Sequence, residues 1–315
     1  TGSSAASDVY KRQGNIYSRL TNPTVGTLEN RLTELEDGAM CVALSSGTSS
    51  VMYSLINIMS QGDNFITDTQ LYGGTFTMFT NILPESGITC KKVDTTDLDL
   101  VEKSIDKNTK AIYVETITNP GLVVADIEGL SKVAHSKGIP LIVDATFTTP
   151  AIQKSLDFGA DIVVHSLTKW MSGHGRVIAG AVIEKGGFEW GNGNFPLYDT
   201  PDTSYGGMRW GHDLGDLSGV AYSLRLRTVP LRNLGANMSP ETAFEVMSGL
   251  ETLGLRMERH CENAKKAAEY LSDHDLVEWV RFPGLKDDPA YELSEKYLKG
   301  TGGTMVVFGI KGGKD

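Results

Sequence analysis

Hydrophobic residues recur with two different periods along this chain. Residues 24–36 place Val25, Leu28, Leu32 and Leu35 at spacings of three and four, which predicts an amphipathic helix. Short runs rich in Val and Ile follow it. We expect strands at residues 39–44, 64–67, 88–93, 111–115, 141–144, 162–165 and 178–183. We expect helices between them at residues 47–59, 75–83, 98–105, 127–136 and 152–158. This alternation predicts an α/β, doubly wound fold whose mostly parallel sheet carries helices on both faces.

The pattern changes after residue 185. Residues 186–215 are rich in Gly, Pro, Asn, Asp and aromatics without a clean period, and we interpret them as a long, functional surface excursion. Residues 240–270 are predicted to be a long helical region, and residues 304–310 a strand. Leu250, Leu253, Leu255 and Met257 are expected to be buried in that helical region.

These patterns suggest a division of the chain into four parts. Residues 1–13 are small, polar and aperiodic, and we expect a non-native or disordered leader there. Residues 14–23 form an N-terminal segment. Residues 24–245 are the expected large domain, and residues 246–315 a smaller C-terminal α/β domain. We expect this last domain to be incomplete, because the chain stops just after a predicted strand.

Composition excludes several classes of function. The net charge of −10 argues against nucleic-acid or anionic-membrane partners. No apolar run is long enough to span a bilayer, and no signal-peptide pattern opens the chain. Cys41, Cys90 and Cys261 lie far apart, so we expect reduced thiols, no metal site and a cytoplasmic location.

Ionisable residues stand at the ends of three predicted strands. One run ends at Glu115, another at Asp144, and a third at His165, directly before Ser166-Leu167-Thr168-Lys169. In open α/β sheets, ligands bind outside the carboxyl ends of the strands. The sequence therefore places its candidate chemistry at this edge.

A fourth candidate is the run of small hydroxyl residues around Gly47, at residues 45–50, between a strand and a helix. Backbone N–H groups at a helix N-terminus form a phosphate site. A phosphate loop, a lysine and a carboxylate are together what pyridoxal 5′-phosphate (PLP) requires. Each feature alone has a commoner interpretation: an N-cap for the loop, a turn residue for Asp144, a solvated charge for Lys169, and a structural hydrogen bond for His165 or His174.

Residues 161–175, DIVVHSLTKWMSGHG, resemble the PLP-lysine signature of the Cys/Met-metabolism (transsulfuration) family. Further segments resemble that family in the same order. They are Tyr17-Ser18-Arg19, Asn22-Pro23-Thr24, residues 71–75, residues 115–120, residues 143–146 and residues 253–260. The resemblance extends from about Gly14 to the end of the chain and implies a fold-type I PLP-transferase.

The resemblance also implies roles for single residues. Lys169 is the lysine that holds PLP as a Schiff base, Asp144 pairs with the pyridine nitrogen, and Tyr72 stacks on the ring. The three are the expected catalytic residues. Cofactor binding is further implied for the backbone of Gly47 and Thr48, the hydroxyls of Ser166 and Thr168, the side chain of Asn119, and Tyr17 and Arg19.

In this family the pair equivalent to Tyr17 and Arg19 reaches the phosphate of a neighbouring subunit. The resemblance therefore implies a homotetramer built from dimers with shared active sites.

The reaction is expected from finer features. Residues 189–205, Phe282-Pro283-Gly284-Leu285 and Lys296-Tyr297-Leu298 resemble O-acetylhomoserine sulfhydrylases, which convert O-acetylhomoserine and sulfide or a thiol to homocysteine and acetate. Gly74 stands where methionine γ-lyases usually carry Cys. Methionine γ-lyase, and cystathionine γ-synthase or γ-lyase, remain the alternatives within the family. The non-enzyme alternative is an inactive PLP-binding fragment or a scaffold.

Overall fold

The computed structural model describes residues 14–313 and is built around a seven-stranded sheet of order β1-β7-β6-β5-β4-β2-β3. β7 runs antiparallel to β1 and β6, and the remaining pairs are parallel. These strands are β1 (Met40–Leu44), β2 (Asn64–Asp68), β3 (Thr89–Val93), β4 (Thr109–Glu115), β5 (Leu141–Asp144), β6 (Ile162–His165) and β7 (Gly180–Glu184). The expected mostly parallel sheet is confirmed.

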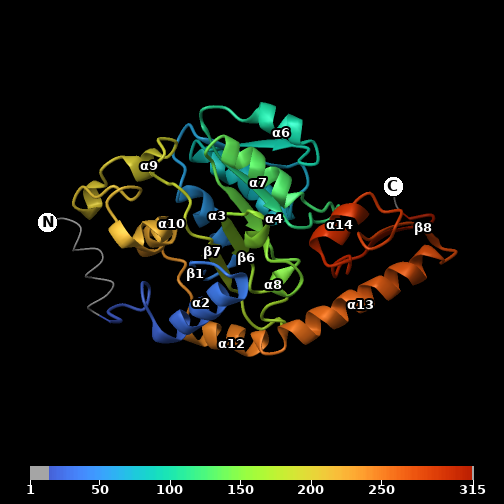
Figure 1. Ribbon diagram of the computed structural model, residues 1–315. Helices are drawn as coiled ribbons and strands as arrows, with labels where there is room; N and C mark the ends of the chain where they lie inside the picture. Colours follow the sequence, from blue (N-terminus) through green and yellow to red (C-terminus); the bar gives the residue numbers. More distant parts are fainter. Residues whose placement is uncertain (1–13, 314–315) are drawn as a thin grey trace.

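Helices cover this sheet and extend beyond it (Figure 1). The α-helices are α2 (Pro23–Glu36), α3 (Gly47–Ile56), α4 (Gly73–Thr77), α5 (Leu83–Glu85), α6 (Leu98–Ser104), α7 (Ile127–Ser136), α8 (Thr149–Ile152), α9 (Pro196–Asp199), α10 (Ala221–Leu226), α11 (Arg232–Leu234), α12 (Pro240–Leu250), α13 (Leu253–Ser272) and α14 (Tyr291–Tyr297). π-helical turns lie at Met78–Ile82 and Arg227–Leu231, and 3-10 turns at Ser155–Phe158, Thr203–Tyr205 and Gly215–Val220.

The core lies where these helices pack on the sheet. α7 contacts β4 and β5, α3 contacts β6 and β7, and α2 contacts β1. β4 and β6 are buried along their whole length, in keeping with the apolar runs at residues 111–114 and 162–164. Leu28 and Leu32, two of the four periodic positions of α2, are fully buried. The period of three and four therefore does mark the inner face of this helix.

One helix prediction was wrong in extent. The helix expected at residues 152–158 is instead the end of α8 and a separate 3-10 turn, because Gln153 adopts an extended conformation between them. The long helical region expected at residues 240–270 consists of two helices, α12 and α13, which are separated at Glu251 and Thr252. Leu255 lies just after this break and is 72% exposed, contrary to expectation.

The excursion at residues 186–215 lies largely at the surface, but buried aromatic residues anchor it in the core. The rings of Trp190, Phe195 and Tyr198 are buried together, and Trp190 stacks on Tyr222 with ring centroids 5.1 Å apart. The segment is thus a surface excursion with a buried aromatic anchor, and the function expected for it stays a prediction. The apolar area of these rings is what holds so aperiodic a segment in place.

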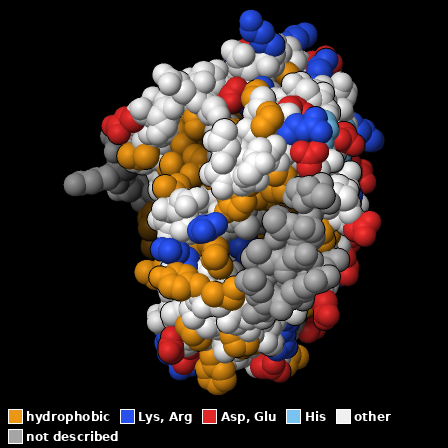
Figure 2. Space-filling view, turned by 90° about the vertical axis from the view of Figure 1, so that its left-hand side faces the viewer, with side chains coloured by type: hydrophobic (Ala, Val, Ile, Leu, Met, Phe, Trp, Pro, Cys, Tyr) orange, Lys and Arg blue, Asp and Glu red, His pale blue; other side chains and the backbone are white. Residues whose placement is uncertain are grey.

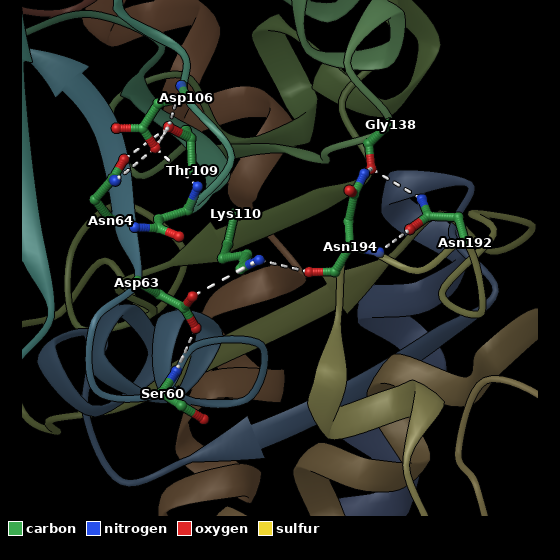
Figure 3. Close-up of polar contacts among 10 residues, drawn as sticks. Ser60, Asp63, Asn64, Asp106, Thr109, Lys110, Gly138, Asn192 and Asn194 are labelled. Carbon is green, nitrogen blue, oxygen red and sulfur yellow. Dashed lines mark hydrogen bonds and ion pairs between the residues drawn. The ribbon is translucent and has the colours of Figure 1, made fainter.

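Polar contacts tie the same excursion to one edge of the sheet (Figure 3). The Asn194 amide donates to the carbonyl oxygens of Lys137 (3.1 Å) and Gly138 (3.0 Å), and Lys110 Nζ donates to the Asn194 carbonyl oxygen (2.7 Å). Lys110 is the second residue of β4, so these contacts lie at the start of that strand. The candidate chemistry lies at the other end of β4, away from the excursion.

The C-terminal part contains a second, small sheet. α13 runs from the end of α12 to an antiparallel pair, β8 (Val277–Arg281) and β9 (Val307–Ile310), beside α14 (Figure 1). Ala264, Ala268 and Phe282 form a separate buried cluster there. The expected boundary near residue 245 stays a prediction. The leader expected at residues 1–13 lies outside the described residues.

Cys41, Cys90 and Cys261 are free thiols. Within residues 14–313, no helix is long and apolar enough to cross a membrane.

Candidate active site

A cavity of about 720 Å³ opens at the carboxyl ends of the parallel strands. Eight of the ten residues expected to bind the cofactor line it: Gly47, Thr48, Tyr72, Asn119, Asp144, Ser166, Thr168 and Lys169. They come from segments spread over more than a hundred residues, and the fold brings them to one edge. The volume lies in the range of small-molecule and cofactor sites.

Tyr17 and Arg19 do not line this cavity. They contact one another, with the Arg19 guanidinium 5.0 Å from the centroid of the Tyr17 ring. Tyr17 is 56% exposed. In this structure they therefore cannot bind the phosphate of a cofactor in the same chain's cavity.

Asp144 is the last residue of β5 and is held in a fixed orientation. Its Oδ1 accepts hydrogen bonds from the N–H (3.0 Å) and hydroxyl (2.5 Å) of Thr146, and its Oδ2 accepts one from the Tyr113 hydroxyl (3.2 Å). Burial raises the pKa of Asp144, and the bonds from Thr146 partly oppose this effect. A cation placed in the cavity beside Asp144 would favour the ionised carboxylate.

The N-terminus of α3 forms the second part of the site. Ser46 caps this helix by accepting a hydrogen bond from the Ser49 N–H (3.0 Å), which leaves the N–H groups of Gly47 and Thr48 without helical acceptors. A Cβ atom on Gly47 would lie 2.5 Å from the Ser166 Cβ atom. Only glycine therefore allows the helix end to approach the segment that carries Lys169.

Ser166, Thr168 and Lys169 lie in the turn that follows β6. The Thr168 hydroxyl donates to the Ala179 carbonyl oxygen (3.1 Å) and accepts from the Ala179 N–H (3.0 Å). Since a hydroxyl has one donor hydrogen, Thr168 cannot donate to a phosphate while it keeps the bond to Ala179. Ser166 is the better placed of the two hydroxyls.

Arg256, which belongs to the family-like segment at residues 253–260 and also lines the cavity, holds the same turn from α13. Its guanidinium donates to the carbonyl oxygens of Trp170 (2.6 Å) and Gly249 (2.7 Å). A Cβ atom on Gly173 would lie 2.4 Å from the Arg256 Cζ atom, so the glycine makes room for the guanidinium. α13 is thereby fastened to the residue after Lys169. Sequence spacing alone does not reveal such a contact.

His165 ends β6 but does not line the cavity. Its Nε2 lies 2.5 Å from Glu36 Oε1, and both side chains are fully buried. His174 Nδ1 lies 2.5 Å from the Ser172 carbonyl oxygen. Both histidines thus make the structural hydrogen bonds that were their commoner interpretation.

These residues fit PLP. The free N–H groups at the α3 N-terminus suit a phosphate, the enclosed Asp144 suits a protonated ring nitrogen, and Lys169 borders the same cavity.

The family described as "Cys/Met metabolism PLP-dependent enzyme" matches residues 2–315. The chain belongs to this family. The fold type, the enzyme class and the PLP cofactor expected from the sequence are therefore confirmed. The individual residue roles stay predictions.

Several relatives cover nearly the whole chain. It is 44% identical over 305 residues to a homocysteine synthase of Schizosaccharomyces pombe, covering 96% of this chain and 70% of that protein. It is 43% identical over 306 residues to an O-acetyl-L-homoserine sulfhydrylase of Leptospira meyeri, covering 95% and 69%.

Solved structures show the same fold. A Campylobacter jejuni protein assigned as an O-acetylhomoserine (thiol)-lyase, which carries a pyridoxyl-lysine phosphate, superposes with a TM-score of 0.92 at 38% identity. The superposition covers 97% of this chain and 76% of that one. An O-acetylhomoserine sulfhydrylase of Wolinella succinogenes gives a TM-score of 0.81 at 35% identity, covering 92% and 80%.

The close approach at Gly47 leads to a first prediction. In Gly47→Ala the added methyl group would push α3 away from Ser166, so PLP affinity should fall about tenfold or more. Gly26→Ala is the matched control, because a Cβ atom there meets nothing within 4 Å. Titration of each purified variant with PLP, followed by absorbance, measures the effect. Equal affinities in Gly47→Ala and Gly26→Ala would contradict this account of the helix end.

Glu115 leads to a second prediction, on pH. Burial and the neighbouring Asp144 raise the pKa of Glu115 to about 8, with Asp68 adding to the effect. The folded, cofactor-free chain thus holds a proton that the unfolded chain releases above its ordinary pKa of about 4.5. The free energy of unfolding should therefore fall as pH rises from about 4.5 to about 8, and fall less steeply in Glu115→Gln. Urea unfolding at several pH values tests this, and parallel slopes in the two proteins would refute it.

Proposed function

We propose that this chain catalyses γ-replacement on O-acetylhomoserine, in which sulfide or another thiol displaces acetate and homocysteine is formed. The observation that carries the proposal is the single cavity shared by Lys169, Asp144 and the α3 N-terminus, in a chain 44% identical to a homocysteine synthase. The similar proteins from Leptospira meyeri and Wolinella succinogenes bear the same type of name. This reaction serves methionine and cysteine biosynthesis.

The residues have separate tasks in the proposed mechanism. PLP, when bound, supplies an electron sink for the negative charge that develops at the substrate α-carbon. Lys169 Nζ takes the proton from the α-carbon and later moves protons at the β-carbon, so that acetate leaves the γ-carbon and sulfide adds there. Asp144 holds a proton on the ring nitrogen, and its bonds from Thr146 and Tyr113 keep it aligned.

The remaining cavity residues bind and orient. The Gly47 and Thr48 N–H groups and the Ser166 hydroxyl would hold the phosphate of bound PLP, and Asn119 and Tyr72 would contact its ring. Tyr72 is 49% exposed and lines the cavity, and in this proposal its hydroxyl assists proton transfer. Thr168 contributes only if its bond to Ala179 is given up.

We further propose that the active enzyme is a homotetramer of dimers, with Tyr17 and Arg19 of one copy completing the cavity of another. Among residues 14–313, Lys169 and Arg256 are the Lys and Arg side chains that line the cavity, and the guanidinium of Arg256 is bound to carbonyl oxygens. A phosphate there lacks an arginine partner from its own chain. Arg19 Nε, shielded from solvent and without a hydrogen-bond partner in that range, is suited to the task.

Exposed apolar side chains support a self-association surface. Ile16 and Tyr17 are 65% and 56% exposed, and Leu234 and Phe244 are 65% and 61% exposed. Figure 2 shows apolar side chains gathered in several patches on the side of the molecule where α9 and α10 lie in Figure 1. Such patches are typical of protein contact surfaces.

A third prediction concerns the reaction. With PLP, the protein should be yellow and should form homocysteine from O-acetylhomoserine and sulfide, whereas Lys169→Ala should lose both the colour and about three orders of magnitude or more of the rate. Product analysis with methionine as sole substrate is the companion measurement. Release of α-ketobutyrate from methionine, without homocysteine synthesis from O-acetylhomoserine, would instead establish a γ-lyase.

A fourth prediction concerns the shared sites. Arg19→Ala and Lys169→Ala should each be nearly inactive alone, yet co-expression of the two differently tagged chains should restore activity. The mixed dimer then contains one cavity with both Lys169 and Arg19 intact. A mixed dimer no more active than its parents would exclude sharing through Arg19.

A further inference from the structure

One buried carboxyl group at the cavity has no task in the mechanism above. Glu115 is the last residue of β4, in register with Asp144 at the end of the neighbouring β5, and its side chain borders the cavity. The residue is only 6% exposed. Burying a carboxyl beside another carboxyl is costly, so its contacts need an explanation.

The two oxygens of Glu115 bind two different segments. Oε1 accepts a hydrogen bond from the Tyr72 N–H (2.8 Å), and Oε2 accepts one from the Asn119 N–H (3.2 Å). Tyr72 follows β2 and Asn119 follows β4, and both residues line the cavity. One carboxylate therefore fixes the distance between two cavity segments that come from different strands.

We propose that Glu115 is a positioning residue that holds Tyr72 and Asn119 in place around PLP through these two hydrogen bonds. This inference rests on the proposed function for the identity of the ligand. The bonds themselves belong to the protein and can be tested without the ligand. Loss of the carboxylate should loosen both segments at once, since each loses one of its fixed points.

Charge links the Glu115 contacts to cofactor binding. Asp144 from β5 and Asp68 from β2 are the carboxyls whose charge disfavours an ionised Glu115, and the Tyr113 hydroxyl faces Asp144 from β4. A cationic ring held by Asp144 would offset this repulsion. It would favour the ionised Glu115, which is the form that accepts from both N–H groups. Binding of the cationic cofactor and the Glu115 bridge to Tyr72 and Asn119 thus stabilise one another.

Glutamine is the informative replacement. Its Oε1 can accept from one of the two N–H groups, but its amide nitrogen is a donor and would face the other. Glu115→Gln therefore keeps the size of the side chain and breaks the bridge. Glu115→Asp keeps the charge but is one methylene shorter, so it reaches one segment and should have an intermediate effect.

Glu184 provides a matched control. It is also a buried glutamate (1% exposed) whose pKa is raised by burial, to about 7, and it accepts from the Ser223 N–H (2.8 Å) and Trp190 Nε1 (3.3 Å). It ends β7 beside Met40, the first residue of β1, and does not line the cavity. Glu184→Gln should reproduce any general loss of stability without a specific effect on the cavity.

Hydrogen exchange and cofactor titration together test the proposal. In the cofactor-free protein above about pH 8, where Glu115 is ionised, Glu115→Gln should speed amide exchange about tenfold or more at residues 70–75, at residues 116–121 or at both, and Glu184→Gln should not. With PLP added, Glu115→Gln should bind about tenfold more weakly and change the visible circular dichroism of the bound cofactor, while Glu184→Gln matches the wild type.

The outcomes separate the two proposals. Unchanged exchange at both segments in Glu115→Gln, or equal effects in Glu115→Gln and Glu184→Gln, would overturn the positioning role. A wild-type protein that stays colourless with PLP would overturn the proposed function. In that case the exchange data still decide whether Glu115 holds the two segments together.

Discussion

Two carboxyl groups stand side by side at the ends of adjacent parallel strands, and the site is organised around them. Glu115 and Asp144 are in register on β4 and β5, and burial raises the pKa of both. Neighbouring backbone and side-chain donors hold each of them, but no Lys or Arg ion pair to either occurs among residues 14–313. Such an arrangement favours a cationic ligand, because a positive charge relieves the repulsion between the pair. A protonated pyridine ring meets that requirement.

Glycines allow the other segments of the site to approach one another closely, because they lack a Cβ atom. The α3 N-terminus can approach Ser166 because Gly47 lacks a Cβ atom, and a Cβ atom on Gly180 would lie 2.2 Å from the Ser46 carbonyl oxygen. At the far side of the Lys169 turn, a Cβ atom on Gly249 would lie 2.2 Å from the Ser172 carbonyl oxygen. The segment from β6 to β7 is therefore held between α3 and the α12–α13 junction. These contacts on both sides hold the turn that carries Lys169, the residue predicted to bind PLP.

Sequence patterns predicted the sheet well and the site in part. Short apolar strands and the polar residues after them are local features, so Asp144, Lys169 and the Gly47 loop could be identified and placed at one edge. Contacts between distant segments leave no such local pattern. The hold of Arg256 on Trp170, the Glu115 bridge and the engaged hydroxyl of Thr168 became visible only in three dimensions. The breaks at Gln153 and Thr252 were missed because a helical period continues across them.

The location of the excursion bears on how the reaction is selected. Residues 189–205 resemble sulfhydrylases in sequence, yet none of them lines the cavity, and Asn194 among them contacts Lys110 at the start of β4. They therefore do not shape the cavity of their own chain. Gly74 is different, because a Cβ atom on it would lie 2.7 Å from the Tyr72 ring. Any larger residue at position 74 must move the Tyr72 ring, which lines the cavity. Differences in reaction between relatives are therefore better sought at Tyr72 and Gly74, where one side chain changes the shape of the cavity directly.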